Sequence, residues 1–289
     1  MMPIRNAWFT RVTTAACFLM LLGIHSTRGG EKALLVDKLE NPESVVVAKD
    51  GRIFVTIIGK SNVDGDGKLG VIENGAVKDF ATGLDDPKGL AILGDDFVVA
   101  DKTKVWRIDA KGTKTLLADT SDFPSKPRFL NDIEVAPNGD IFVSDSGTFI
   151  SNGAVFKISP AKQVTVVIDT KSLKQLKAPN GLLLDGPDHL LLADFSSGIV
   201  YRVEIATGKA EKIAEGTGNG DGIARDKKGR IYVSDYRGGR VFRLGSPTDK
   251  PTLFADGFKT AADIAVDSDG RIMVPDMQTG TITHLSIDD

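Results

Sequence analysis

The feature that most constrains the fold of this chain is a short apolar unit that repeats six times. Its copies are GRIFVT (51–56), DFVVAD (96–101), DIFVSD (140–145), HLLLAD (189–194), GRIYVSD (229–235) and GRIMVPD (270–276). The Asp residues that end the last five copies are 44, 49, 41 and 41 residues apart, which is the period of a four-stranded propeller blade. The sequence therefore predicts an all-β fold, a six-bladed β-propeller of four-stranded antiparallel blades.

The connections within the repeats support this prediction. An Asp-Gly or Asn-Gly pair stands before the repeated run at Asp50-Gly51, Asn138-Gly139 and Asp269-Gly270. Such pairs tolerate the positive φ that primed hairpin turns require, so we expect two-residue turns between antiparallel strands.

The two ends of the propeller sequence are expected to meet. The last repeat supplies strand-like runs at 264–266, 272–274 and 281–285 but no fourth, and Lys32–Val36 resembles the missing strand. We expect this N-terminal strand to close the last blade, since closure pairs edges that would otherwise recruit other chains. The propeller domain is thus assigned to residues 31–289.

Residues 1–30 have a different composition. Arg5 and Arg11 are followed by a 13-residue apolar stretch, Val12–Ile24, that is too short to span a bilayer comfortably. This pattern predicts a signal peptide, a secreted or periplasmic protein, and no membrane insertion after the signal is removed; an uncleaved anchor is the alternative. The only cysteine, Cys17, lies in this segment, so cysteine-based catalysis and disulfides are excluded from the predicted mature chain.

Charge excludes one class of partner. Removing residues 1–30 takes away three arginines and no acids, which leaves 33 basic against 39 acidic residues and a net charge of −6. Because no basic stripe with interleaved aromatic residues occurs, nucleic acid is not an expected partner. We expect a monomer that binds a small molecule.

One position of the repeat carries most of the chemistry. It lies two residues before the first apolar residue of each inner strand, and in a propeller such positions converge on one end of the central channel. In chain order it holds Glu43, Lys88, Asn131, Asn180, Asp221 and Ala262. Four of these are oxygen donors, two of them carboxylates, a set that suits Ca²⁺ better than zinc or copper. Alternatively, Asn and Asp occur here only because they shape the turns that enter each blade.

Several motifs around these positions resemble a known family. They are Asn131-Asp132-Ile133 with Pro137-Asn138-Gly139, Pro179-Asn180-Gly181-Leu182 with Ala193-Asp194, Gly220-Asp221-Gly222-Ile223 with Asp226, and Pro42-Glu43. Together they are similar to the regucalcin and gluconolactonase family of six-bladed propellers, with diisopropyl fluorophosphatase and the paraoxonases as more distant relatives.

The resemblance implies a metal site and a reaction. Glu43, Asn180 and Asp221 correspond to metal ligands, and Asn131 to a residue that either binds the ion or holds the substrate beside it. Asp221 is also the candidate catalytic base, because a carboxylate at the metal can take a proton from water. The implied activity is calcium-dependent hydrolysis of a lactone or related ester. The alternative is a non-catalytic, calcium-stabilised propeller that binds a ligand or protein on the same face.

Two cations near these positions are candidates for binding substrate. Arg128 lies three residues before Asn131, whereas gluconolactonase-like proteins tend to place an arginine two before. Lys88 occupies a ring position, where it is expected either to bind a substrate carboxylate or oxyanion, or to turn away and pair with Asp132 or Asp85.

Three further segments carry expectations. Residues 62–73 satisfy the spacing of a calcium loop but lie between strands, so an acidic hairpin is expected, with a second calcium site at Asp64 and Asp66 as the alternative. The longer loops 121–130 and 146–153 are expected to overhang the central site. The recurrent Asp at the end of each repeat is expected to cap turns rather than to catalyse.

Overall fold

The computed structural model describes residues 1, 30–245 and 250–287. Residues 2–29 of the predicted signal segment, residues 1–30, lie outside the described residues. In the part of the chain that is described, the helical content is one 3₁₀ turn, η1 (Thr120–Asp122), and no helix is long and apolar enough to cross a membrane.

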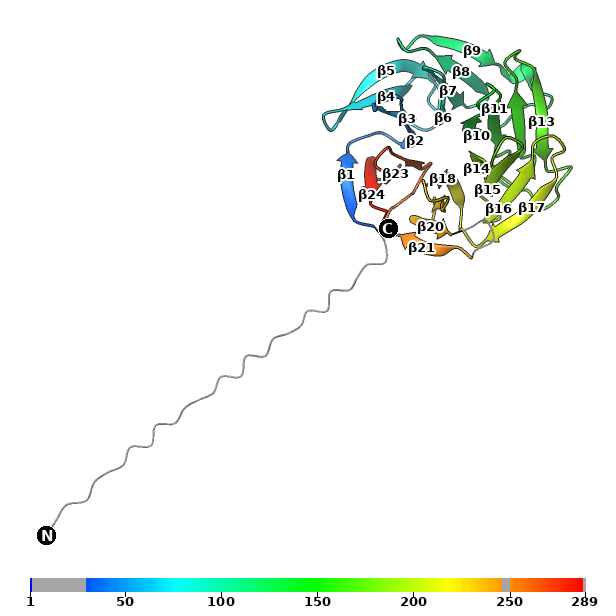
Figure 1. Cartoon of the computed structure of the whole chain (residues 1–289). Helices are drawn as coiled ribbons and strands as arrows, with labels where there is room; N and C mark the ends of the chain where they lie inside the picture. The colour runs from blue at the N-terminus through cyan, green and yellow to red at the C-terminus, as the bar shows by residue number, and fades with distance from the viewer. Residues whose placement is uncertain (2–29, 246–249, 288–289) are drawn as a thin grey trace.

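Six four-stranded antiparallel sheets are arranged as blades around a central axis (Figure 1). The first three blades are β2 (Pro42–Val47), β3 (Ile53–Ile57), β4 (Gly67–Glu73) and β5 (Ala76–Leu84); β6 (Pro87–Leu93), β7 (Asp96–Asp101), β8 (Lys104–Ile108) and β9 (Lys114–Ala118); and β10 (Leu130–Val135), β11 (Ile141–Asp145), β12 (Ala154–Ile158) and β13 (Val164–Asp169). The next two are β14 (Pro179–Leu184), β15 (His189–Asp194), β16 (Ile199–Glu204) and β17 (Ala210–Glu215); and β18 (Gly220–Arg225), β19 (Ile231–Asp235), β20 (Arg240–Leu244) and β21 (Thr252–Ala255). Within each blade the strands pair in chain order, so the repeated sequence unit is the second strand of a blade.

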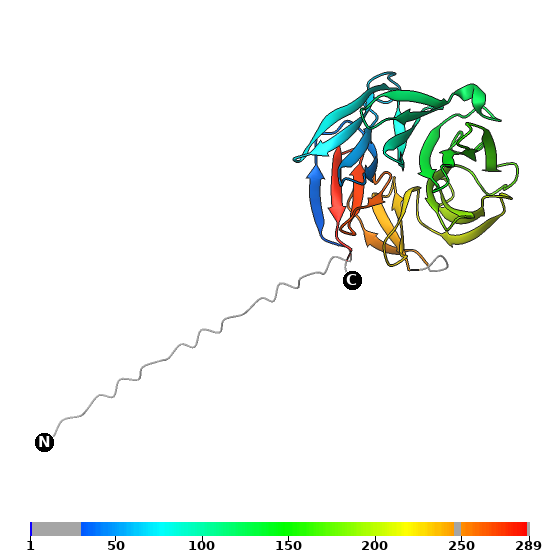
Figure 2. The ribbon, with the colours of Figure 1, turned by 45° about the horizontal axis from the view of Figure 1, so that its top comes forward.

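The sixth blade contains both ends of the propeller sequence. It consists of β22 (Ala265–Val266), β23 (Ile272–Asp276), β24 (Thr281–Leu285) and β1 (Lys32–Val36), in the order β1-β24-β23-β22. Lys32 pairs with Leu285 and Ala33 with His284, and the tilted view in Figure 2 shows β1 alongside β24. The predicted fold class and the closing role of the N-terminal strand are both confirmed.

The inner hairpin turns at the three Asp-Gly and Asn-Gly pairs differ from the prediction. At residues 48–52 the amide of Ala48 donates to the carbonyl of Arg52, and the amide of Gly51 donates to the carbonyl of Ala48. The loop therefore has three residues, and only its glycine has a positive φ, of 85°. A three-residue loop that ends in a left-handed glycine needs no positive φ at the preceding Asp, which explains why Asp-Gly and Asn-Gly fit equally well.

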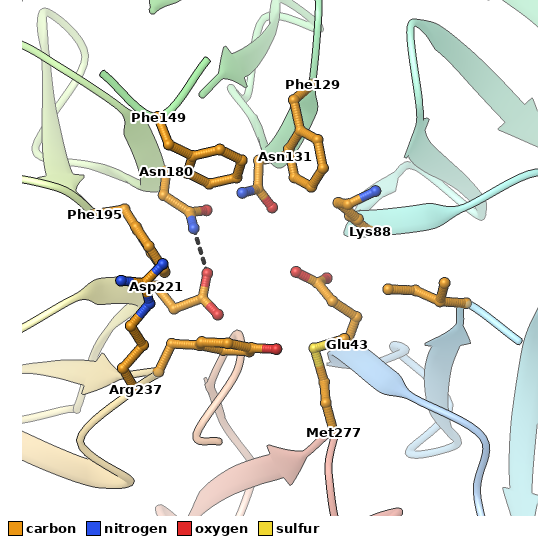
Figure 3. A pocket seen from close by; sticks show the side chains of 12 residues that line it. Glu43, Lys88, Phe129, Asn131, Phe149, Asn180, Phe195, Asp221, Arg237 and Met277 are labelled. Atoms are coloured by element: carbon orange, nitrogen blue, oxygen red, sulfur yellow. Dashed lines mark hydrogen bonds between the residues drawn. The ribbon is translucent and has the colours of Figure 1, made fainter. Parts of the chain in front are cut away.

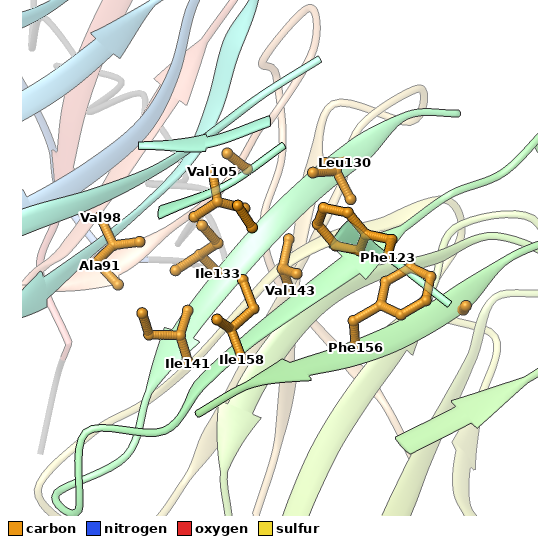
Figure 4. Close-up of a cluster of buried hydrophobic side chains, with 13 residues drawn as sticks. Ala91, Val98, Val105, Phe123, Leu130, Ile133, Ile141, Val143, Phe156 and Ile158 are labelled. Atoms are coloured by element: carbon orange, nitrogen blue, oxygen red, sulfur yellow. The ribbon is translucent and has the colours of Figure 1, made fainter. Parts of the chain in front are cut away.

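The hydrophobic core is distributed between neighbouring blades. Figure 4 shows one cluster, in which side chains of the second blade such as Val98 and Val105 pack against Ile133, Val143 and Phe156 of the third. Because each second strand is covered on both faces, it reads in sequence as a continuous apolar run. Each second strand is also paired with the inner strand that carries the ring position of its blade.

Candidate metal and substrate site

A cavity of about 220 Å³ opens at one end of the central channel. Figure 3 shows that the polar side chains from the inner strands point into it together. The residues that line it are Glu43, Ile58, Lys88, Phe129, Asn131, Phe149, Asn180, Phe195, Asp221, Tyr236, Arg237 and Met277. Five of the six ring positions expected from the sequence therefore share one cavity.

A β-bulge places each of these five side chains. The register of the inner strand against its neighbour shifts between Pro42 and Val45 in the first blade, and between Gly220 and Ile223 in the fifth. The equivalent shift occurs in the second, third and fourth blades, always across the ring position. Bulges re-aim side chains and leave amides unpaired; the amide of Ser44, for example, donates to the Thr56 hydroxyl instead of to the ladder.

The recurrent Asp residues fix the loops that lead into the inner strands. The carboxylate of Asp145 accepts hydrogen bonds from the amides of Arg128, Phe129 and Gly147. Asp194 likewise binds the amides of Lys177 and Ala178. In the five blades that carry it, this Asp lies at the end of the second strand, and the carboxylates of Asp145 and Asp194 hold the loop just before the ring position, in keeping with the structural role expected for them.

Two buried carboxylates dominate the electrostatics. Burial, followed by the charges of Asp221 and Asp263, raises the pKa of Glu43 well above its usual value. Burial and then the Asp263 charge raise the pKa of Asp221 to about 8. Glu43 Oε2 has no hydrogen-bond partner among the described residues. Both groups would become more stable as anions if a cation lay between them.

The two amides are oriented by their neighbours. Asn131 Nδ2 donates to the Ser146 hydroxyl at 3.1 Å, and that hydroxyl donates to the Pro179 carbonyl at 2.8 Å. Asn180 Nδ2 donates to Asp221 Oδ1. With both nitrogens engaged, both carbonyl oxygens are left as acceptors, and Figure 3 shows the Asn131 oxygen directed into the cavity.

This donor set fits a hard cation. Two carboxylates and two amide oxygens are ligands that Ca²⁺ accepts, and the orphaned Glu43 oxygen lacks the partner that a cation would supply. No group of three or more His, Cys, Asp or Glu side chains suited to a metal occurs among the described residues. Asn131 and Asn180 are the further side-chain carbonyl-oxygen donors that the described residues offer beside the two carboxylates of the cavity.

Lys88 lies in the wall of the cavity and is buried, so it does not point outward. Its Nζ donates to the Asp86 carbonyl at 3.1 Å and lies 4.2 Å from the ring centroid of Phe129. Neither Asp132 nor Asp85 is the partner. Desolvation lowers the pKa of Lys88, and the nearby Glu43 opposes that shift.

The remaining candidates lie away from the cavity. Arg128 is exposed and does not line it, although its backbone amide binds Asp145. In the hairpin at 62–73, Asp64 forms an ion pair with Lys102, and Glu73 lies 2.6 Å from Lys78 Nζ. These two carboxylates have separate cationic partners.

A second acidic layer lies below the ring positions. Asp132 accepts hydrogen bonds from the amides of Ile133 and Leu182, both at 2.6 Å. The Ser44 hydroxyl donates to Asp263 at 2.5 Å. Burial raises the pKa of Asp263 to about 6 and the pKa of Asp132 well above its usual value. Asp263 follows Ala262, the one ring position that does not line the cavity.

The loops 121–130 and 146–153 each contribute a ring to the cavity, as expected from their predicted position over the site, but sequence reasoning missed the aromatic wall that these rings help to form. Phe129, Phe149, Phe195 and Tyr236 form a series of neighbouring rings with centroid separations of 4.9, 5.5 and 6.0 Å, and we call this series the aromatic arc. Phe195 and Tyr236 directly follow the recurrent Asp of their blades. Ile58 and Met277 occupy the same place in the first and sixth blades and also line the cavity. An apolar or aromatic residue directly after the second strand of a blade was therefore the sequence signal that could have predicted part of this wall.

The fold and the central cavity define a six-bladed propeller with an oxygen-rich site on its axis. The sequence profile described as the SMP-30/Gluconolactonase/LRE-like region matches residues 76–252, more than half of the chain. The chain therefore belongs to this family, which confirms the resemblance.

Solved structures agree on the fold. A gluconolactonase from Xanthomonas campestris has a TM-score of 0.73 at 17% identity, with 90% of each chain covered. A calcium-binding protein, regucalcin, from Agrobacterium tumefaciens has a TM-score of 0.73 at 19% identity, with 90% of this chain and 94% of that chain covered. A chain of a nidogen/laminin complex also matches, with a TM-score of 0.62 at 17% identity over 74% of this chain and 79% of that one. A search of curated proteins found no significant match.

Proposed function

We propose that this protein is a calcium-dependent hydrolase that opens a lactone or related ester in the central cavity. The observation that carries the proposal is the convergence of Glu43, Asn131, Asn180 and Asp221 on one cavity, with a Glu43 oxygen that finds no partner in the described part of the chain. Membership of a family that includes gluconolactonases supports the reaction class. Export through the N-terminal segment is part of the same proposal.

The residues have separate roles. Glu43, Asn180 and Asp221 would hold the ion, and Asn131 would either complete its ligand set or hold the substrate beside it. When bound, Ca²⁺ would polarise the ester carbonyl and stabilise the oxyanion that forms. Asp221, which a bound cation would keep ionised, would accept a proton from the attacking water and return it to the ring oxygen as the ester C–O bond breaks. Lys88 supplies a second positive charge at the cavity wall for the developing oxyanion.

A non-catalytic role has one specific observation in its favour. Glu43, Asp132 and Asp221 are buried and Asp263 is half-buried. The positive charge of Lys88 offsets only Glu43 and Asp221 among these four acids. An ion that neutralised these acids would stabilise the propeller without any reaction.

The test is a calorimetric calcium titration of the metal-stripped protein, beside Asp221→Ala and Asp64→Ala. The proposal expects one site that is lost in the first variant and retained in the second, whose aspartate lies in the acidic hairpin. Lactone hydrolysis is then measured with and without chelator. Calcium binding that raises the unfolding temperature without any chelator-sensitive hydrolysis would favour the non-catalytic role. No binding at all would reject both.

A further inference from the structure

The carboxylates and amides of the cavity are concentrated on its floor, and its side is mostly apolar, with Arg237 placed over the Phe195 ring. Glu43, Asn131, Asn180 and Asp221 come from the bulges of the inner strands, whereas the aromatic arc comes from the loops above them. Three of its four rings are phenylalanines, which offer no hydrogen-bond donor or acceptor. A ligand that reaches the floor must therefore lay part of its surface against phenyl rings.

The centre of the arc is held in a strained conformation. Phe149 has φ 63°, in the left-handed region that bulky side chains rarely adopt. Its amide donates to the Ser146 carbonyl at 2.9 Å, and Ser196 of the next blade donates to its carbonyl at 2.6 Å. Such strain persists only where the surroundings fix it, and it is concentrated at functional sites. The loop is built to hold this ring over the cavity.

The neighbouring side chain in the same loop behaves differently. Ile150 is 79% exposed and does not line the cavity. The loop therefore contributes one ring to the cavity and turns the next apolar side chain to solvent, so the two residues form a matched pair for experiment.

We propose that the aromatic arc makes the site selective for a small apolar lactone or ester, with a hydrocarbon ring or short chain beside the ester group, over a polyhydroxylated sugar lactone. The identification of the ligand as a lactone rests on the proposed function. The preference for an apolar ligand rests only on the residues that line the cavity. A cavity of about 220 Å³ is smaller than the roughly 300–1,000 Å³ of sites for drug-sized ligands, which limits the substrate to about one hydrocarbon ring beside the lactone. The hydroxyl groups of a sugar lactone, if placed against the three phenylalanines, would lose their hydrogen bonds to water without gaining hydrogen bonds to the protein.

The test uses lactams as slowly reacting analogues, so that binding is separated from turnover. Affinities for 3,4-dihydroquinolin-2-one and for D-glucono-1,5-lactam are measured by calorimetry with calcium present. A hydrophobic pocket rejects one added hydroxyl by about a hundredfold, so we expect the aromatic lactam to bind at least about a hundredfold more tightly. Phe149→Ala and, independently, Phe195→Ala should each weaken its binding by about tenfold or more. Ile150→Ala should leave it unchanged.

The outcomes separate the two proposals. A preference for the sugar lactam, binding of neither lactam, or a preference that both phenylalanine variants leave intact would overturn the selectivity. Tight, arc-dependent binding of the aromatic lactam by a protein that hydrolyses neither dihydrocoumarin nor gluconolactone would reject the hydrolase and leave the selectivity standing. Hydrolysis of gluconolactone in preference to dihydrocoumarin would reject the selectivity and leave the hydrolase standing.

Discussion

Replacing Asp145 with alanine should destabilise the propeller by about 3 kcal/mol. Its buried carboxylate accepts hydrogen bonds from the amides of Phe129 at 2.8 Å, Gly147 at 2.9 Å and Arg128 at 3.1 Å. A bond to a charged acceptor contributes about 1.5–3 kcal/mol, so the gross loss for three is about 5–9 kcal/mol. Desolvation raises the pKa of Asp145, which means that burying the charge already costs free energy, and alanine removes that cost. Water that enters the space left by the side chain reduces the loss further.

Asp145→Asn distinguishes this explanation from simple loss of packing. The amide variant keeps one acceptor oxygen for Phe129 and Gly147 but presents an NH₂ group to the Arg128 amide, so it should lose about 1.5 kcal/mol. Urea denaturation measures both variants, and an unchanged m-value would show that the denatured state is not altered. The matched control is Asp140→Ala in the hairpin of the same blade, whose ion pair to Lys157 spans 3.6 Å; it should cost under about 1 kcal/mol. A loss in Asp145→Ala no greater than in this control would refute the reasoning.

Three further predictions follow from other contacts. Burial raises the pKa of Glu134 to about 7, so the folded state binds more protons than the unfolded state between about pH 4.5 and 7, and stability falls as the pH rises through that window. Since this side chain is half-buried, Glu134→Gln should stabilise the protein by about 1–2 kcal/mol at pH 8 and by nothing at pH 4, measured by urea unfolding at both values. Lys88→Met should tighten calcium binding by about tenfold, because a positive charge leaves the cavity wall; unchanged affinity in a calorimetric titration would contradict this. Ser196→Ala should cost about 1 kcal/mol and speed hydrogen exchange at residues 148–152, because Phe149 loses its bond to the next blade.

The repeat made the architecture predictable. Because each second strand is packed between neighbouring blades, its apolar character is kept in all six repeats and its terminal Asp in five, although the loops around it differ in length. The closing strand was also predictable, since residues 32–36 share the character of an outer strand that the sixth repeat lacks. The turns were assigned the wrong length because an Asp-Gly pair fits a two-residue loop and the end of a three-residue loop equally well.

The site residues could be predicted only where they recur at the same position of each repeat. Glu43, Asn131, Asn180 and Asp221 share one register, so their convergence could be inferred from the fold. Phe129 and Phe149 belong to loops of unequal length, and the path of such loops depends on hydrogen bonds such as the one from Ser196. Arg128 shows the same dependence on loop path. Its backbone amide binds Asp145, but its side chain does not line the cavity.

The pairing of β1 with β24 has a consequence for the order of folding during synthesis. Lys32, near the start of the propeller sequence, can find Leu285 only after almost the whole chain has been made. Five blades can form as their strands emerge from the ribosome, while β1 remains an unpaired edge until the last strand is released. The ring is therefore closed last, by the contact between strands that lie farthest apart in the propeller sequence. A chain that stops before β24 would keep five blades and leave an open seam at which other chains could add a strand.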